Sequence, residues 1–202
     1  PALAQFRMTT TITGKFDGYV NDFDLKGIRF STTDTDGFAD KPTSHNGGIS
    51  GELDGSVTGL PDSYAMMVNA NVHKLTFSTH GLEKFVKGWA PSVNLDLDKF
   101  CKGERLTFRG RASGPLNRLH AHGTMHTDFG KADLNVTLRN VIDPNRPLEI
   151  GGSASTERLD IGRIMAGIPV GECDMRTGLN ATFAKDSLGI VIDSLYVDGL
   201  DV

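Results

Sequence analysis

Three histidines lie close enough together to suggest a metal site. Apolar and polar residues alternate in the predicted strand that contains His120, His122 and His126. The three histidines all fall on its polar positions, so they share one face. Two histidines at positions i and i+2 can reach one metal ion. His126, however, would lie about 13 Å from His122, at ~3.3 Å per residue. We therefore interpret the three as the polar face of an amphipathic strand, and predict no metal and no cofactor.

Two short motifs approach known catalytic or ion-binding patterns and fall short of them. Gly47-Gly48-Ile49-Ser50-Gly51 places its glycines wrongly for the turn that presents a nucleophilic serine. Asp34-Thr35-Asp36-Gly37 begins like a calcium loop, but the glutamate that such a loop requires after its glycine is absent. The glycines are also not clustered before a helix, as a phosphate-binding loop needs. We predict that the chain is not an enzyme.

Composition favours strands and turns over helices. Of the 25 acidic residues, 19 are Asp, which favours turns, and six are Glu, and there are 24 Gly. The chain of 202 residues carries a net charge of −4. Because acids outnumber the 21 Lys and Arg, no excess of positive charge points to nucleic acid, and we predict that none is bound.

Period-two alternation of apolar and polar residues dominates the chain. Between 131 and 139, for example, Ala132, Leu134, Val136 and Leu138 alternate with polar residues. Successive strands joined by short turns pair antiparallel. The predicted strands are residues 6–13, 16–20, 25–31, 49–57, 63–72, 106–112, 119–125, 131–139, 148–155, 177–183 and 188–197.

Other segments are predicted to be turns, one long loop and two short helices. Asp-Gly pairs at Asp17, Asp36, Asp54 and Asp198 predict turns, and residues 32–48 predict the loop. Ser78 and Thr79 can cap a helix at 81–88, and Ser155 and Thr156 a helix at 157–166 that Gly167 and Pro169 end. The predicted fold is all-β: an elongated, curved antiparallel sheet with two short helices.

The segments around the two predicted helices form a repeat. Each runs from a strand through the short helix and a link with a cysteine, Cys101 or Cys173, into a long strand. Repeated supersecondary units are typical of stacked architectures. We therefore expect residues 1–202 to be a single fragment of a longer, repeat-built protein, and predict no disulfide, because equivalent positions lie several strands apart at ~4.8 Å per strand.

An apolar face along such a sheet has two interpretations. If nothing covers the face, it forms a groove, and if a second sheet packs on it, the domain is a β-sandwich. Periodicity alone leaves both open, and without other information we favour the sandwich. The candidate groove residues lie on the apolar faces of predicted strands: Met66, Val68, Ala70, Leu134, Val136, Leu138, Ile190 and Ile192.

A family resemblance favours the groove. The run Leu159-Asp160-Ile161-Gly162-Arg163-Ile164-Met165, followed by Gly171 and by Gly178-Leu179-Asn180-Ala181, resembles the repeats of TamB-like proteins in the AsmA superfamily. So does the closing run 188–200, from Leu188 to Leu200. The resemblance is closest over 154–202 and extends over 75–139.

What the resemblance implies is a taco-shaped β-sheet with a hydrophobic groove, in a periplasmic cell-envelope protein whose parent chain is anchored in the inner membrane. Such proteins are implicated in phospholipid transfer toward the outer membrane, and TamB also in outer-membrane protein assembly. The implied partners are phospholipid acyl chains and an outer-membrane β-barrel protein.

The alternative is a β-sandwich binding module, such as a glycan-binding domain or an adhesin repeat. Against it, the chain has one Trp and three Tyr to stack on sugars. A hydrolase has only generic acids and histidines in its favour.

Overall fold

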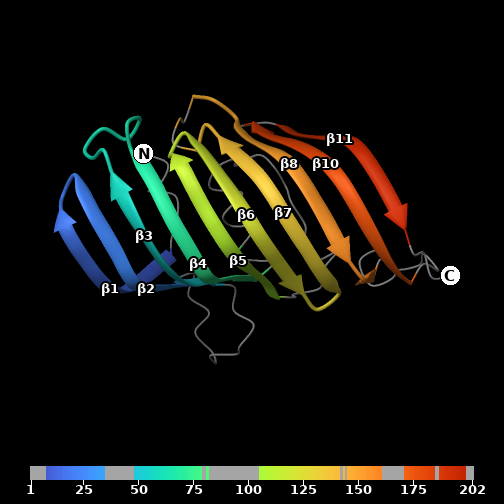
Figure 1. Cartoon of the computed structure of the whole chain (residues 1–202), viewed down its shortest axis with the longest axis horizontal. Coiled ribbons are helices and arrows are strands. Elements are labelled where there is room, and N and C mark those ends of the chain that lie inside the picture. Colours follow the sequence, from blue (N-terminus) through green and yellow to red (C-terminus); the bar gives the residue numbers. More distant parts are fainter. Residues whose placement is uncertain are drawn as a thin grey trace.

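The structure is a computed structural model. It describes residues 8–34, 48–78, 81, 105–141, 143, 145–160, 171–184 and 187–198, apart from the side chains of Met8, Thr9, Thr33, Asp34 and Leu188. Strands make up 82% of this part, and they form one antiparallel sheet that does not close on itself. Figure 1 shows the strands side by side in an arched sheet that runs from β1 to β11. The predicted all-β, curved antiparallel sheet is confirmed.

The order of strands in the sheet follows the order in the chain. Each of the long strands pairs with the next, and only the two-residue β9 lies off this path, paired with β10. The strands are β1 (Met8–Tyr19), β2 (Asp22–Asp34), β3 (Ile49–Thr58), β4 (Met67–Ser78), β5 (Arg105–Pro115), β6 (Arg118–Thr127), β7 (Gly130–Arg139), β8 (Leu148–Glu157), β9 (Leu159–Asp160), β10 (Glu172–Ala184) and β11 (Ser187–Asp198).

Several strand boundaries differ from the prediction. β1 is one continuous strand through Gly14, where the sequence predicted two. β2 continues to Asp34, so the predicted loop begins too early, and residues 35–47 of that loop lie outside the described part. β4 begins at Met67 and runs to Ser78, whereas the sequence predicted 63–72. In each case hydrogen bonding to a neighbouring strand extends the element beyond its clearest apolar alternation.

Two predicted Asp-Gly turns are wrong. Asp17-Gly18 lies inside β1 and Asp54-Gly55 inside β3. A Cβ atom on Gly55 would lie 2.1 Å from the backbone oxygen of Asn69 in β4, so this glycine permits close approach of two strands rather than a turn. Of the other two pairs, Asp36-Gly37 and Gly199 lie outside the described residues, and Asp198 is the last residue of β11.

The second predicted helix is wrong over its first four residues. Ser155 and Thr156 belong to β8, where they pair with Asp133 and Ala132 of β7. Arg158 turns the chain with a φ of 53°, and β9 follows at once. The strands on both sides satisfy the backbone groups that a cap would have served. Residues 161–166 lie outside the described part.

The first predicted helix is described only at Gly81. This residue is helical, and its backbone N–H donates a hydrogen bond of 2.9 Å to Ser78 Oγ. The contact has the geometry of an N-cap, in which a serine oxygen accepts from the N–H three residues on. Residues 82–88 lie outside the described part.

Four strands contain irregularities that bend the sheet. Register shifts occur in β1 near Gly14, in β2 near Gly27, in β4 near His73 and in β11 near Asp193. Such bulges increase the local twist of a strand. In β2 the bulge is held by Asp54 of β3, whose Oδ1 accepts the N–H of Gly27 at 2.5 Å. The bulges therefore help to give the single sheet its curvature.

Candidate functional site: the apolar face of the sheet

One unbroken row of apolar residues crosses the whole sheet. Residues directly opposite each other in paired strands project from the same face. Following the observed pairs from β1 to β11 gives one apolar or glycine residue on each of ten strands. The row is Phe16, Leu25, Gly55, Ala70, Ala112, Ala121, Val136, Gly152, Leu179 and Ile192.

Seven of the eight sequence-predicted groove residues lie on this face. Ala70, Val136 and Ile192 belong to the row itself. The other four are on the same face of the same strands, two residues from a row member: Val68, Leu134, Leu138 and Ile190. The structure thus brings residues from β4, β7 and β11 onto one continuous surface.

Met66 is the exception among the predicted groove residues. It precedes β4, and its backbone oxygen accepts a hydrogen bond of 2.9 Å from the N–H of Leu116. The alternation that seemed to include Met66 begins only at Val68, because residues 59–66 form the connection between β3 and β4. Met66 therefore lies at the end of the sheet, outside the strand face to which the sequence assigned it.

Exposure on this face increases from the middle of the sheet toward its edges. Val72 of β4 and Phe108 of β5 are each 9% exposed. Phe16 of the edge strand β1 is 66% exposed, and Ile192 of the edge strand β11 is 58% exposed. Among the described strands there is one sheet and no second layer over this face. The edges of the apolar face are therefore in contact with water.

The sequence alone did not predict that small residues of two strands meet in the middle of the apolar face. Gly110 of β5 pairs with Gly123 of β6, and Ala112 pairs with Ala121. Because these four residues have small side chains or none, they project little from the sheet in the middle of the apolar face. The side chains of Phe108 and Met125 beside them are larger. The signal was present in the sequence as small residues at alternate positions of 106–112 and 119–125, but only the pairing shows that they meet.

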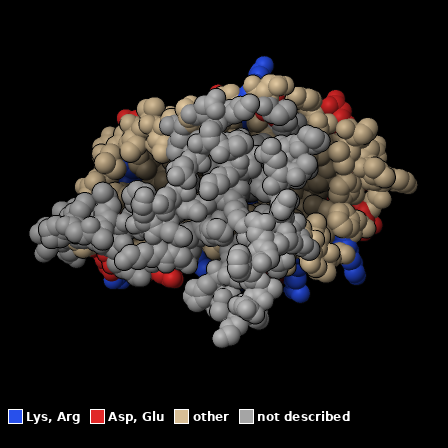
Figure 2. Space-filling model, turned by 180° about the vertical axis from the view of Figure 1, so that it is seen from behind, with Lys and Arg blue, Asp and Glu red and all other residues tan. Residues whose placement is uncertain are grey.

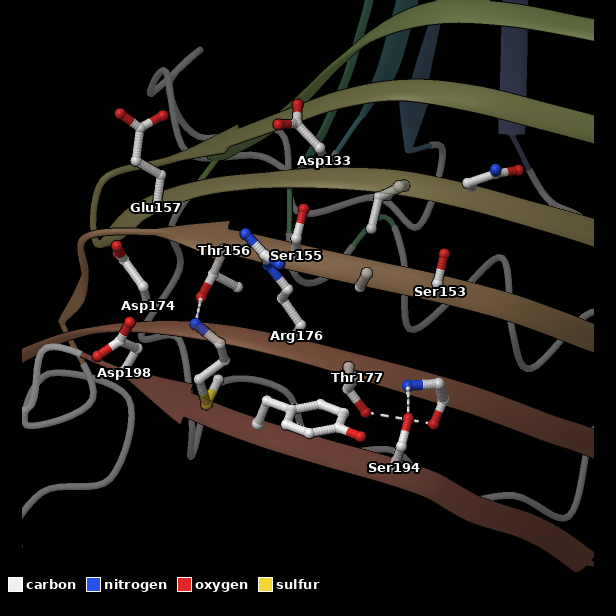
Figure 3. Close-up of a pocket in the computed structure, with 16 residues that line it drawn as sticks. Asp133, Ser153, Ser155, Thr156, Glu157, Asp174, Arg176, Thr177, Ser194 and Asp198 are labelled. Carbon is white, nitrogen blue, oxygen red and sulfur yellow. Dashed lines mark hydrogen bonds between the residues drawn. The ribbon is translucent and has the colours of Figure 1, made fainter.

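The opposite face is polar and bears a recess of about 930 Å³ over β7, β8, β10 and β11. Asp133, Ser155, Arg176 and Tyr196 are successive cross-strand partners along it. In Figure 3, Asp133, Ser155 and Arg176 follow one another across β7, β8 and β10. Sequence analysis did not find this recess, because its residues come from four segments that are polar for the ordinary reason that they face water.

The polar recess offers hydrogen bonds rather than an activated group. Some hydrogen-bonding groups of its wall are already used within the protein. Thr156 Oγ1 accepts the N–H of Met175 at 2.9 Å, and Ser194 Oγ accepts the N–H of Gly178 at 3.2 Å. Asp174 accepts the N–H of Arg158 at 2.8 Å. Such a surface can hold a polar ligand by hydrogen bonds.

Cys173 is a free and buried thiol, 1% exposed. It lies in β10 opposite Leu159 of β9. Burial, together with the nearby charge of Asp174, raises the pKa of this thiol. Because the thiolate is the nucleophile, a raised pKa opposes thiol chemistry. Cys101, its predicted repeat equivalent, lies outside the described residues.

The three histidines of β6 lie on the polar face, as predicted. The rings of His120 and His122 are 5.9 Å apart and tilted, and His126 lies further along, opposite Lys131. Within the described ranges no group of three or more metal-binding side chains comes together. Nor do those ranges contain a helix long and apolar enough to cross a bilayer.

In the view from behind, Lys, Arg, Asp and Glu of the described residues lie mainly around the outline, and most described surface inside it is uncharged (Figure 2).

Comparisons with protein-family models, with curated proteins and with solved structures found no match to this chain.

Proposed function

We propose that this chain is a non-catalytic segment of a lipid-transfer protein, and that its apolar face holds the acyl chains of phospholipids. The observation that carries the proposal is the row of eight apolar residues and two glycines from Phe16 to Ile192, unbroken across the sheet. Because the described strands form one layer, this face leaves apolar surface in water unless something apolar covers it. An acyl chain can do this without a specific contact.

The length of the row suits transfer rather than a single binding site. Ten strands at ~4.8 Å per step make a row of roughly 43 Å. The acyl chains of one leaflet span only about 15 Å, half of the hydrocarbon core. Several lipids could therefore lie along the row, and each could move to the next position without leaving the apolar surface.

The expected affinity for each lipid is also suitable for movement. Full burial of one CH₂ group is worth ~0.8 kcal/mol. A chain lying on one face of a sheet is covered on one side only, so each CH₂ contributes less than this. The face would hold lipids weakly at many equivalent places, which lets them leave again.

The cellular setting follows from the resemblance to TamB-like proteins of the AsmA superfamily. It supports a place in the periplasm, with the parent protein anchored in the inner membrane and an outer-membrane β-barrel protein as its partner. Transfer between the two membranes, assistance in outer-membrane protein assembly, or both would fit a long apolar face. All of these are parts of the same proposal.

The polar recess supports a second candidate, a glycan-binding module. Ser153, Ser155 and Arg176 can hydrogen-bond to hydroxyl groups, and Tyr196, at 70% exposure, can lie against a sugar ring. The β-sandwich that the sequence analysis considered for such a module is absent from the described strands, which form one sheet. We therefore favour the apolar face as the functional surface.

A matched pair of substitutions on β11 tests the lipid proposal. Ile190 and Val191 are neighbours, each 58% exposed, and they project from opposite faces of the strand. Ile190→Glu places a charge on the apolar face, and we expect it to weaken binding of a phospholipid with a fluorescent acyl chain about tenfold, from the loss of 1–2 kcal/mol of apolar contact. Val191→Glu should leave binding unchanged.

Both variants should stay folded, because both positions are already exposed. Circular dichroism and the urea midpoint check this. Equal loss of lipid binding in the two variants, or no binding by the unaltered protein, would reject the apolar face as the site. Retained binding in Ile190→Glu together with loss in Arg176→Ala would favour the polar recess instead.

A further inference from the structure

The polar face carries a band of positive charge that the net charge of the chain conceals. β4, β5 and β6 contain no Asp or Glu at all. Their polar-face positions present exposed basic residues side by side, and we call six of them the basic band. These are Lys74, Arg109, Arg111, Arg118, His120 and His122.

Pairing between the strands brings these side chains together. Arg111 of β5 lies directly opposite His122 of β6, and Arg109 is two residues along the same strand. His120 contacts His122 ring to ring at 5.9 Å. Arg118 is two residues before His120 on the same face. At ~3.3 Å per residue and ~4.8 Å per strand the band measures roughly 20 Å along the strands and 10 Å across them.

Among the described residues, the Lys and Arg side chains of the band make no ion pair, whereas most of those outside it do. In the part of the chain that the structure describes, Lys74, Arg109, Arg111 and Arg118 make no ion pair. Elsewhere in that part, six basic residues are paired with carboxylates: Lys26 with Asp17, Arg29 with Glu52, Lys131 with Glu157, Arg139 with Glu149, Arg146 with Asp143 and Arg158 with Glu172. Lys15 and Arg176 of the described residues make no ion pair, but they lie singly on β1 and β10 rather than side by side.

The strands on both sides of the band carry acids, and the two bases of β7, Lys131 and Arg139, are paired with Glu157 and Glu149 of β8. β3 carries Glu52 and Asp54 on this face, and β7 and β8 carry Asp133, Glu149 and Glu157. A broad anionic surface, such as a membrane, would meet these acids as well as the band. A narrow anion aligned with the strands would meet only the cations. The width of the band thus favours a linear ligand.

We propose that the basic band binds a linear polyanion that carries phosphate groups, lying along β5 and β6. Guanidinium groups suit phosphate because they bind it with two parallel hydrogen bonds. The polar-face positions of β4, β5 and β6 include no Phe, Tyr or Trp on which nucleobases would stack, so the ligand is recognised through its phosphates rather than through bases. The proposal is independent of lipid binding on the other face.

The test is the salt dependence of binding to long-chain inorganic polyphosphate. With four Lys and Arg in contact, log K should fall with log salt with a slope of about −2.8, or roughly 50-fold between 50 and 200 mM salt. The double variant Arg109→Gln, Arg111→Gln removes two contacts, so its slope should halve to about −1.4 and its loss over the same range should be roughly 7-fold. Both residues are exposed, so the fold should not change.

The control variant Arg29→Gln, Lys131→Gln changes the net charge equally but outside the band, and it should keep the slope of the unaltered protein. Equal loss of slope in both double variants would overturn the proposal, since it would show a response to net charge alone. So would binding of monophosphate as tightly as the polymer, binding of single-stranded DNA more tightly than polyphosphate, or binding only to vesicles with about 30% phosphatidylglycerol.

Discussion

Asp54 is a residue whose role depends on strand pairing rather than on its neighbours in sequence. Followed by Gly55, it predicts a turn, yet it lies inside β3. Its carboxylate accepts the N–H of Gly27 across one strand boundary and contacts His73 Nε2 at 2.6 Å across the other. The Gly27 N–H, and after it His73, lower the pKa of this carboxyl below its ordinary value. The charged side chain thus fixes two bulges.

The lowered pKa of Asp54 predicts a pH dependence of stability. A carboxyl whose pKa is depressed by folding stabilises the protein above its unfolded pKa of about 4, and this contribution is lost as the pH falls through the folded pKa. Asp54→Asn should therefore lower the free energy of unfolding at pH 7 and differ less from the unaltered protein at pH 3. Urea denaturation at several pH values measures this. A difference that stays constant across pH would contradict the role of the charge. The control is Asp24→Asn, which removes an exposed carboxylate of β2 that does not bridge a bulge.

At the scale of elements, the close contact of β5 and β6 depends on Gly110 and Gly123, which lie opposite each other. A Cβ atom on Gly123 would lie 2.2 Å from the backbone oxygen of Arg109 and 2.6 Å from the Cα of Gly110. Both obstacles are backbone, so the strands would have to separate. This pair therefore sets the spacing in the middle of the apolar face.

Gly123→Ala should destabilise the protein by about 1–3 kcal/mol, because overpacking forces the backbone to shift. Gly189→Ala in β11 is the matched control, since a Cβ there meets nothing within 4 Å. It should be neutral or stabilise by up to about 1 kcal/mol, through the entropy of the unfolded chain. Equal urea midpoints for the two variants would contradict the close contact.

How far the elements follow from the sequence depends on what each pattern measures. Alternation located the strands and the shared face of Leu134, Val136 and Leu138, because inward and outward positions differ in polarity. It could not show that Asp54-Gly55 continues a strand instead of forming a turn, or that Ser155 and Thr156 pair with β7 instead of capping a helix. Those outcomes depend on partners far away in the sequence. So does the assembly of the basic band from side chains of β4, β5 and β6.

At the scale of the whole molecule, both edges of the sheet expose apolar side chains. Ile12 and Phe16 on β1, and Ile192 and Leu195 on β11, are each more than half exposed. Neither edge strand has an outer partner among the described strands. Long edge strands with apolar side chains tend to pair with further strands.

The exposed edges predict self-association of this 202-residue chain. Its sedimentation coefficient should rise with concentration, and Ile192→Lys should suppress the rise, because a charge on the apolar side of an edge strand blocks pairing with another strand. Thr137→Lys, on the polar face of the internal strand β7, should leave association unchanged. A coefficient that is independent of concentration in the unaltered protein would show that the edges do not pair.

Photocrosslinking at two neighbouring positions tests most directly whether the apolar face holds acyl chains. Leu138 projects from that face, and Thr137 projects from the other face of the same strand. A photoreactive residue at 138 should capture phospholipid from vesicles on illumination, and the same residue at 137 should capture little, with both proteins folded. Capture at 137 equal to that at 138, or capture at neither position, would contradict the account.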